Sequence, residues 1–279
     1  MRKIDKIMLL VLFVALFGRL GERILFGAEG ETVRNPLIVR AALDAPQQAI
    51  GESLSDSIIE PSPPKANSRY TGSAFALSRD GHWATATHVT DGCKRLDLLQ
   101  ETSGGSFRRV RVDGWRALKD KDVAIMDSAQ GEPGLVLAAT LAQANDRGFF
   151  FGYPKGKASA GFAVHLGRSR MIRQNGRQRI KEISDEWAVY EMLPGKKIAL
   201  GGNSGGPMLN AQGEVVGVVS AGSDRRGRVN TSIVPSLKPL QNFSNPEYRP
   251  GQRLTRDNYV AYGQKLRRTG LVSKVDCRT

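Results

Sequence analysis

A serine in a glycine-rich turn is the residue best placed for chemistry in this 279-residue sequence. It lies in Gly201-Gly202-Asn203-Ser204-Gly205-Gly206-Pro207, where the glycines allow a sharp turn that exposes the hydroxyl. The amides of Gly202 and Ser204 would converge on one point, and each such donor is worth about 3–4 kcal/mol to a carbonyl oxygen that gains charge. An ordinary turn is the alternative, but the full string favours a nucleophile with an oxyanion hole.

A serine nucleophile needs a base within hydrogen-bond reach. The sequence has three histidines, and His88 follows a strand-like run in Thr85-Ala86-Thr87-His88-Val89, where small neighbours would leave the imidazole over a cleft. His82 stands in an Asp-Gly-His turn and is predicted to be solvated. His165 stands in a basic stretch and is predicted to lie at the surface. His88 is therefore the predicted base, although a histidine after a strand is often only structural.

A carboxylate is needed to hold the tautomer of the imidazole and stabilise its cation. Asp122 begins Asp122-Val123-Ala124-Ile125, so it would stand at the entrance of an apolar strand, where a carboxylate can be buried beside a histidine. Asp120 and Asp127 are the nearest rivals, with solvated loop charges as their ordinary interpretation. We predict Asp122 as the third member of the site.

The elements that must position these residues are short strands. Apolar and polar residues alternate in several β-prone runs, and Asp80-Gly81, Asp113-Gly114 and Asn175-Gly176 are turn or hairpin dipeptides. The runs are residues 72–78, 83–89, 108–115, 122–127, 148–154, 186–192 and 213–222. The pattern predicts an all-β sandwich or barrel.

A helical pattern occurs only near the end of the chain. Tyr259, Tyr262 and Leu266 would share one helical face, and Gly270 would end the helix, so we predict a helix over about 256–269. A last strand is predicted around 271–277.

The first 67 residues differ in composition from the rest. A basic start and the apolar run 7–18 have the form of a secretory signal, so we predict export to the periplasm or beyond. Residues 1–28 would be either a cleaved signal peptide or an uncleaved anchor to the inner membrane. Residues 29–67 include Pro61-Ser62-Pro63-Pro64 and are predicted to form a linker, with packing of part of the stretch onto the body as the alternative. Residues 68–279 would form the functional domain.

In chain order, the His88, Asp122 and Ser204 segments resemble the trypsin-like serine proteases, and most of all the protease domain of bacterial exported Do-like (high-temperature-requirement) proteins. The separations are 122 − 88 = 34 and 204 − 122 = 82 residues. Residues 148–154 resemble the family's glycine-aromatic-proline segment, and residues 215–222 resemble the strand after the nucleophile. The resemblance covers about residues 68–240.

The resemblance implies two packed six-stranded antiparallel β-barrels with the site in the cleft between them. Ser204 would attack the scissile carbonyl, His88 would transfer the proton and Asp122 would orient His88. The amides of Gly202 and Ser204 would form the oxyanion hole. The edge formed by Ser220, Ala221 and Gly222 would pair with the substrate backbone.

Three departures from the family qualify this prediction. Asn203 stands where digestive members carry Asp, so activation by N-terminal trimming is not expected. Ile198, six residues before Ser204, would form an apolar base of the primary pocket and favour a small or medium apolar P1 residue, because a buried unpaired cation is costly. The residues after 240 are too few for the peptide-binding PDZ module that Do-like proteins append.

The two cysteines, Cys93 and Cys277, are 277 − 93 = 184 positions apart. An oxidising compartment permits a disulfide between them, and two buried free thiols are the alternative. Neither they nor the histidines have the spacing of a metal site, and no metal or cofactor is predicted.

The formal net charge is +14, and all of the excess lies after residue 66. Residues 155–181 hold eight Lys or Arg and no Asp or Glu. A solvated loop is the ordinary interpretation, and the alternative is a patch for an anionic membrane surface, an envelope polymer or acidic substrates. Nucleic acid is disfavoured by the export signal and by the lack of interleaved aromatic residues.

The sequence therefore predicts an exported serine endopeptidase that acts on polypeptides. The rival hypothesis is a catalytically idle binding module on the same fold, which would hold unfolded chains or envelope partners in its cleft. The oligomeric state is not predicted.

Overall fold

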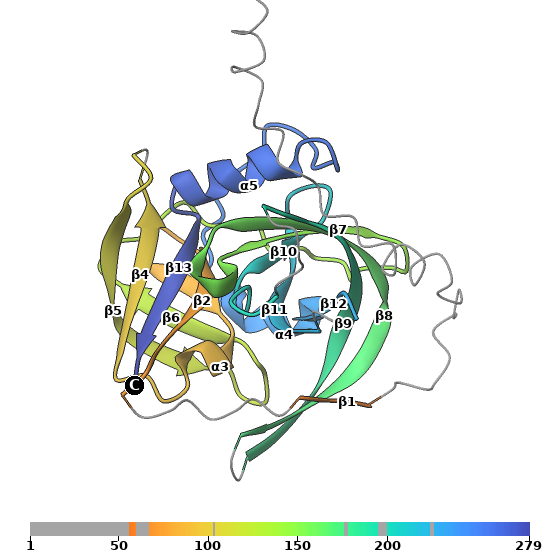
Figure 1. Cartoon of the computed structure of the whole chain (residues 1–279), viewed down its shortest axis with the longest axis horizontal. Helices are drawn as coiled ribbons and strands as arrows, with labels where there is room; N and C mark the ends of the chain where they lie inside the picture. The colour runs from red at the N-terminus through yellow and green to blue at the C-terminus, as the bar shows by residue number, and fades with distance from the viewer. Residues whose placement is uncertain (1–55, 60–66, 103, 176–177, 195–199, 224–225) are drawn as a thin grey trace, which may run out of the picture. The chain divides into compact units, whose positions relative to one another are not determined.

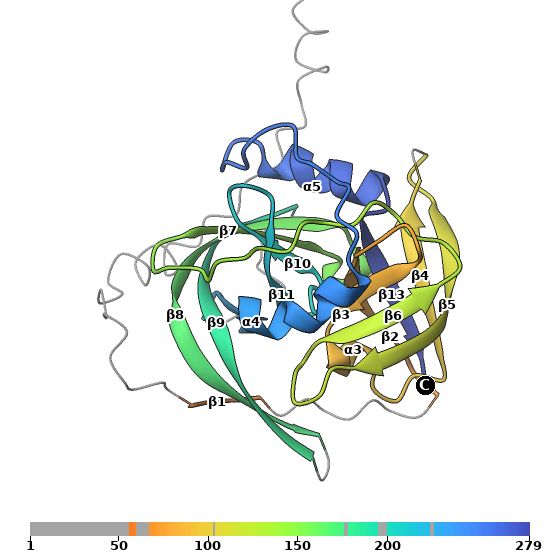
Figure 2. The same cartoon turned by 180° about the vertical axis from the view of Figure 1, so that it is seen from behind.

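The computed structural model describes residues 56–59, 67–102, 104–175, 178–194, 200–223 and 226–279. All of them belong to one compact unit that spans Thr32–Thr279. Two closed β-barrels stand side by side in this unit (Figures 1 and 2). Each has six strands with antiparallel pairing, as the resemblance implied, and a short helix follows near the C-terminus.

The first barrel closes in the strand order β13-β2-β3-β6-β5-β4. Its strands are β2 (Arg69–Ala76), β3 (His82–Thr85), β4 (Arg95–Glu101), β5 (Phe107–Ala117), β6 (Ala124–Ser128) and β13 (Val272–Arg278). Alternation along the strands fills its interior: Leu96 and Leu98 of β4 and Val110 and Val112 of β5 are buried, while their neighbours Arg109 and Arg111 are exposed. The last strand of the chain therefore completes the first barrel.

The second barrel closes in the order β8-β7-β10-β11-β12-β9, with β9 pairing back onto β8. Its strands are β7 (Arg147–Gly152), β8 (Ser159–Asn175), β9 (Gln178–Leu193), β10 (Pro207–Leu209), β11 (Val215–Ser223) and β12 (Arg228–Ser232). β8 and β9 form a long hairpin that extends past the end of β7. The residues from 155 to 175, for which a solvated loop was the ordinary expectation, thus lie mostly in a strand.

Short helical segments connect the barrels or cover their ends. They are α3 (Thr87–Thr90), η1 (Pro154–Gly156), α4 (Val234–Leu237), η2 (Lys238–Phe243) and α5 (Tyr259–Arg268). α5 contacts β4 and β13 of the first barrel and β8 of the second, so it bridges them (Figure 1). Its buried face carries Tyr259, Tyr262 and Leu266, as predicted, and Gly270 follows with a φ of 78°. No helix in the described part of the chain is long and apolar enough to cross a membrane.

Two local predictions were wrong. Asp113-Gly114 is not a turn, because it lies inside β5, where the register against β6 shifts between Val112 and Gly114. The strand predicted over residues 83–89 ends at Thr85, and His88 lies on α3 instead. Strands β4, β8, β10 and β12 have no counterpart among the predicted runs.

The predicted leader, residues 1–28, lies outside the described residues. Within the predicted linker, Asp56–Ile59 form β1, which pairs in parallel with Arg170–Arg173 of β8. The N-terminal stretch therefore adds a strand to the edge of β8 beyond β7.

Candidate functional site

Asp122 and His88 are in direct contact. The Nδ1 atom of His88 lies 2.8 Å from Oδ2 of Asp122, and the backbone N–H of His88 donates to Oδ1 of the same carboxylate at 3.1 Å. Both carboxylate oxygens thus hold one residue, which fixes the position and the ring of His88. The Asp122 side chain is 1% exposed and that of His88 is 23% exposed. One edge of the ring is therefore open to solvent while its carboxylate partner is buried.

Asp122 is held by the turn before β6 and by the second barrel. Leu118 donates to Val123 at 2.8 Å across this turn, and the hydroxyl of Thr87 donates to the Lys121 carbonyl at 3.1 Å. The backbone N–H of Asp122 donates to Oε1 of Glu182 on β9 at 3.1 Å. A buried carboxylate of the second barrel therefore supports the aspartate of the first.

Ser204 stands in a loop that both barrels hold. The Ser204 carbonyl accepts a hydrogen bond from the N–H of Ser73 on β2 at 2.8 Å, and the Ser73 hydroxyl donates to the Gly202 carbonyl at 2.8 Å. On the other side, the N–H of Gly205 donates to Val219 of β11 at 2.7 Å. The side chain of Asn203 is fully buried in this loop. The loop conformation is thus specified by bonds to β2 and β11.

Two glycines make this conformation possible. Gly202 has a φ of 105°, and a Cβ there would stand 2.6 Å from the carbonyl oxygen of Tyr153. Gly205 has a φ of 86°, and its Cβ would stand 2.1 Å from the Ser73 carbonyl and 3.0 Å from the N atom of Ala86, two residues before His88. A side chain at either position would be strained and would push the loop off β2. The Ser204 loop therefore packs directly against the segment that carries His88.

The two amides predicted to form the oxyanion hole are those of Gly202 and Ser204. The carbonyl of Gly201 accepts a bond from the N–H of Lys155 at 3.0 Å. Because the N–H and C=O of a trans peptide point in opposite directions, the N–H of Gly202 faces away from Lys155. Among the described residues, neither this N–H nor that of Ser204 donates a hydrogen bond. Both remain available to an external acceptor.

The Ser204 hydroxyl has its hydrogen-bond partner on β11 in this conformation. It donates to the Ser220 carbonyl at 3.4 Å, and within the described part of the chain it makes no hydrogen bond with His88. A serine hydroxyl can turn about its Cα–Cβ bond, and exposed side-chain rotamers interconvert on the ps–ns timescale. The structure therefore brings the three predicted residues to one place without the second hydrogen bond formed.

The predicted substrate-binding edge lies on β11 beside this loop. The pairing of β11 with β12 is irregular between Val219 and Ala221, so Ser220 stands at a bulge with its carbonyl directed toward Ser204. A Cβ on Gly222 would stand 2.6 Å from the Leu200 side chain, so that side chain packs against the edge. Ile198, the predicted base of the primary pocket, lies outside the described residues.

The other two histidines differ from the predictions. His165 is buried, not at the surface: its Nε2 atom lies 2.9 Å from Oδ1 of Asp185, and its ring contacts Trp187 inside the second barrel. His82 is half-buried, with its Nδ1 atom 2.8 Å from Oδ1 of Asp127. The sequence around each histidine did not reveal these carboxylate partners, because the pairing of the strands brings them next to the histidines.

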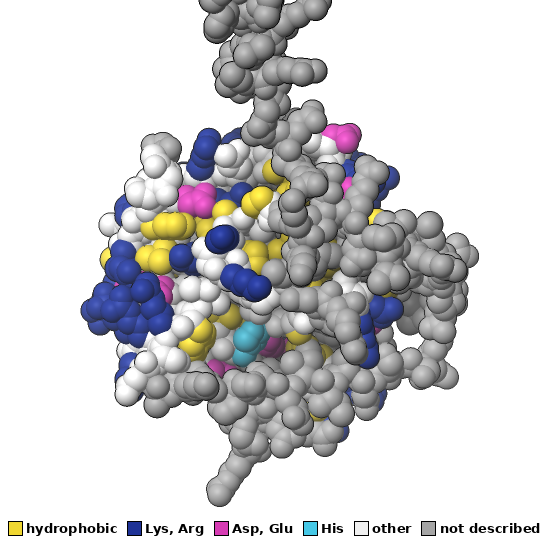
Figure 3. Space-filling model, in the orientation of Figure 1, with side chains coloured by type: hydrophobic (Ala, Val, Ile, Leu, Met, Phe, Trp, Pro, Cys, Tyr) yellow, Lys and Arg dark blue, Asp and Glu magenta, His cyan; other side chains and the backbone are white. Residues whose placement is uncertain are grey.

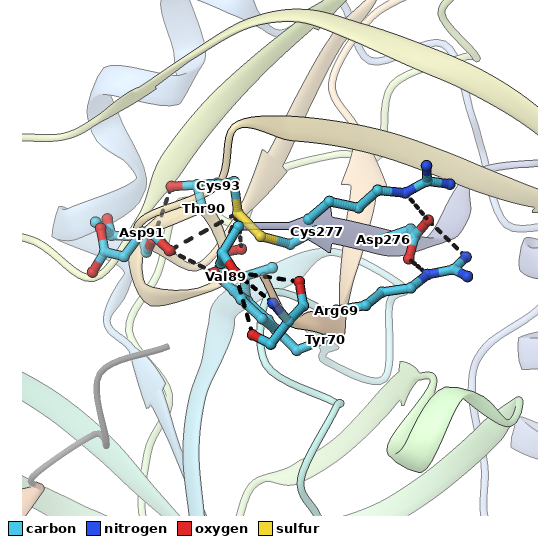
Figure 4. Close-up of a disulfide and its surroundings, with 12 residues drawn as sticks. Arg69, Tyr70, Val89, Thr90, Asp91, Cys93, Asp276 and Cys277 are labelled. Atoms are coloured by element: carbon cyan, nitrogen blue, oxygen red, sulfur yellow. Dashed lines mark hydrogen bonds and ion pairs between the residues drawn. A yellow bond between two sulfur atoms is a disulfide. The ribbon is translucent and has the colours of Figure 1, made fainter. Parts of the chain in front are cut away.

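Cys93 and Cys277 form a disulfide with a Cα–Cα distance of 5.6 Å (Figure 4). Cys93 follows α3 by three residues, and Cys277 lies in β13, so the bond ties the segment after His88 to the last strand. The hydroxyl of Tyr70 donates to the Asp91 carbonyl at 2.5 Å, and burial raises the pKa of Tyr70 to about 12. A disulfide and a hydrogen bond therefore hold the segment that follows α3.

Sequence reasoning missed Ser73 and Glu182, which hold the Ser204 loop and Asp122. Neither stands in a recognisable motif, because each acts through a contact made across the fold. Among the described residues no group of three or more His, Cys, Asp or Glu side chains is arranged to hold a metal ion.

Comparison with known proteins gives a family match and several relatives. Residues 72–218, more than half of the chain, match the family described as the trypsin-like peptidase domain. HhoB of Synechocystis sp. is 29% identical over 164 residues, which cover 58% of this chain and 36% of HhoB. The chain therefore matches only about a third of the length of that relative.

Two solved structures are similar to this chain at lower identity. The active form of the Rv3671c protease from M. tuberculosis is 19% identical, with a TM-score of 0.51, over 73% of this chain and 96% of that one. The HtrA-type protease AlgW is 19% identical, with a TM-score of 0.44, over 61% of this chain and 50% of that one.

Proposed function

The chain belongs to the trypsin-like peptidase domain family, and on that premise we propose that it is a serine endopeptidase that hydrolyses peptide bonds with His88, Asp122 and Ser204. The observation that carries the proposal is the half-open His88 ring, held by the buried Asp122 at 2.8 Å next to the glycine-rich Ser204 loop. A buried carboxylate on Nδ1 leaves Nε2 as the nitrogen that can accept a proton.

The proposed reaction begins when Ser204 turns from the Ser220 carbonyl toward Nε2 of His88. His88 takes the hydroxyl proton as Oγ attacks the scissile carbonyl, and Asp122 stabilises the imidazolium that forms. The free N–H groups of Gly202 and Ser204 would bind the oxyanion. His88 then gives its proton to the leaving amine, and water hydrolyses the acyl-enzyme by the same route.

A binding module on the same fold is the second candidate. The observation that favours it is the hydrogen bond of 3.4 Å from the Ser204 hydroxyl to the Ser220 carbonyl, because this bond uses the proton that His88 would have to accept. Such a protein would hold peptides along β11 without cleaving them.

A fluorophosphonate probe separates the two candidates because it reacts only with an activated serine. We expect the wild type to be labelled and Ser204→Ala to remain unlabelled. Ser106→Ala, at an exposed serine between β4 and β5, is the matched control and should label like the wild type. Absence of labelling in the wild type, with peptide binding retained, would favour the binding module.

We also propose an apolar P1 preference, on the strength of Ile198 and of Leu200, which packs against Gly222. A peptide library should show preferred cleavage after small or medium apolar residues. A strong preference for Arg at P1 would contradict this, because no acidic residue is expected at the base of the pocket.

Export to the cell envelope is proposed from residues 1–18 alone. Fusion of this segment to a reporter that works only after export should give activity, and replacing apolar residues of 7–18 by Asp should abolish it.

For residues 155–181 we propose contact with an anionic membrane or envelope polymer. Binding to anionic vesicles that persists at high salt would contradict it, because exposed charges are screened there.

A further inference from the structure

The outer surface of the first barrel carries a dense group of arginines. The paired positions of β2, β13, β4 and β5 place five of them on one face, here called the arginine face: Arg69, Arg95, Arg109, Arg111 and Arg278. Figure 3 shows Lys and Arg side chains gathered at the left of the molecule, over β4 and β5.

Two buried carboxylates stand in the middle of the arginine face. Asp97 and Asp276 are opposite each other on β4 and β13, and both side chains are fully buried. Arg109 contacts Asp97 at 2.6 Å and Asp276 at 3.2 Å, and Arg69 holds Asp276 from the other side (Figure 4). Burial alone would raise the pKa of Asp276, but the hydrogen bonds from the two arginines keep that pKa below its ordinary value.

These contacts leave a surplus of positive charge. Among these seven residues, five guanidinium groups against two carboxylates give 5 − 2 = +3. The side chains of Arg69, Arg95, Arg109 and Arg278 remain 38% to 56% exposed although they contact the carboxylates. A guanidinium has five N–H donors, so donors remain for an external anion. The carboxylates thus order the arginines without neutralising the face.

The arginine face adjoins the candidate site. Ser73 of β2, which donates a hydrogen bond to the Ser204 loop, lies on the same outer face as Arg69. Arg69 stands four residues before Ser73 in β2. At about 3.3 Å per residue, Arg69 is roughly 13 Å along the strand from Ser73. Lys274, the β13 partner of Ser73, adds a positive charge next to Ser73.

We propose that the arginine face binds an acidic segment of the polypeptide substrate, on the leaving-group side of the scissile bond. The inference rests on the proposed function. If the part of the substrate before the cleaved bond pairs with Ser220–Gly222 of the second barrel, the part after the cleaved bond runs from Ser204 over the first barrel. An extended chain covers the distance to Arg69 in about four residues. Glu or Asp at about the third to fifth positions after the cleaved bond would therefore meet the arginines.

Three peptides with one cleavable core test this. One carries three Glu at positions three to five after the bond, one carries three Gln there, and one carries three Glu before the bond. We expect kcat/KM to be about tenfold higher for the first peptide at low ionic strength, since the contributions of a few exposed ion pairs add up to roughly that factor. The preference should fall toward one in about 0.5 M salt.

Arg111→Glu is the informative variant, because Arg111 is exposed and makes no ion pair among the described residues, so its loss leaves both buried carboxylates paired. We expect it to reduce the preference for the first peptide at least threefold. Arg253→Glu, at an exposed arginine before α5, is the matched control and should leave the preference unchanged. Equal cleavage of the Glu and Gln peptides, or equal effects of the two variants, would overturn the proposal.

Peptide binding to Ser204→Ala separates this inference from the proposed function. If no peptide is cleaved by the wild type, tighter binding of the first peptide by Ser204→Ala, measured by fluorescence anisotropy, still supports the acidic-segment site. Equal binding of all three peptides overturns it. Binding of vesicles rich in phosphatidylglycerol that Arg111→Glu abolishes, without any peptide preference, would assign the face to a membrane and would also overturn it.

Discussion

Two histidine–aspartate pairs have almost the same separation but lie in different surroundings. His88 and Asp122 are 2.8 Å apart between the barrels, and His165 and Asp185 are 2.9 Å apart inside the second barrel. The His88 side chain is 23% exposed, whereas that of His165 is 1% exposed. Distance alone therefore does not distinguish a reactive pair from a structural one.

The second aspartate also has a permanent cation. The Nε atom of Arg168 lies 3.2 Å from Asp185, and the His165 ring packs edge-on against Trp187 with their centroids 4.8 Å apart. A packed ring with a shared carboxylate has neither space for a substrate nor access to solvent. An imidazole acts as a base only where its free nitrogen meets a second reactant, and the Ser204 loop supplies one beside His88.

The largest loss of activity is expected when the His88 ring is removed. His88→Ala should lower kcat by about 10⁴- to 10⁶-fold, because the serine loses its base. The melting temperature should fall less than for loss of the His165 ring, since the His88 side chain is 23% exposed and the backbone N–H of residue 88 still donates to Asp122. Peptide hydrolysis and probe labelling measure the first effect and calorimetry the second. Activity within tenfold of the wild type would show that His88 is not the base.

Removal of one charge from each aspartate sharpens the comparison. Asp122→Asn should lower kcat by about 10⁴-fold, because an amide that donates to Nδ1 stabilises the wrong tautomer of His88. Asp185→Asn is the matched control and should leave kcat within about twofold. The kinetic constants of both variants, at equal folded fractions, decide the matter. Equal losses of kcat would mean that both pairs act only through stability.

The same comparison shows what sequence reasoning can reach. His88, Asp122 and Ser204 could be chosen because each stands in a local motif, and their order in the chain carries information about the fold. His165 was wrongly predicted at the surface because its neighbours in the sequence are basic. Its environment is set by register: Asp185 and Trp187 face it from β9, twenty residues and more along the chain.

The limits of local patterns also appear in the strands. The alternation of apolar and polar residues predicted β5 and β11, whose inner faces are apolar. It did not predict β4, whose outer face carries Arg95 and Asp97. Strand β8 was missed because its outward arginines dominate the composition. A strand with a charged outer face is therefore hard to recognise from its own sequence when the carboxylates that pair with its arginines lie on other strands.

The stability of the second pair is the next test. His165→Leu should lower the free energy of unfolding by about 3 kcal/mol, because it breaks a buried pair and leaves Asp185 to Arg168 alone. The variant should retain kcat, and urea unfolding followed by tryptophan fluorescence measures the change. Asp185→Leu/His165→Leu together should recover part of the loss. An unchanged unfolding midpoint in His165→Leu would mean that the pair contributes nothing net.

A smaller effect is expected from the carboxylate behind Asp122. Glu182→Ala removes the acceptor of the Asp122 N–H and should lower kcat about tenfold with KM unchanged, which corresponds to one hydrogen bond to a charged group. Glu182→Gln keeps an acceptor oxygen and should restore most of kcat. A rise in KM, or equal losses in both variants, would indicate that Glu182 supports the fold of β9 and does not position Asp122.

The third pair gives the smallest expected effect and so sets the baseline of the comparison. His82 and Asp127 are 2.8 Å apart, but both side chains are about a third exposed and Asp127 also contacts Arg116 at 2.6 Å. Because solvent screens such a pair and Arg116 remains for Asp127, His82→Gln should change the free energy of unfolding by less than about 0.5 kcal/mol and leave kcat unchanged. Chemical unfolding and peptide hydrolysis measure both quantities. A loss as large as that of His165→Leu would mean that ring packing against Phe243, at a centroid distance of 5.3 Å, and not carboxylate pairing, decides what these histidines contribute.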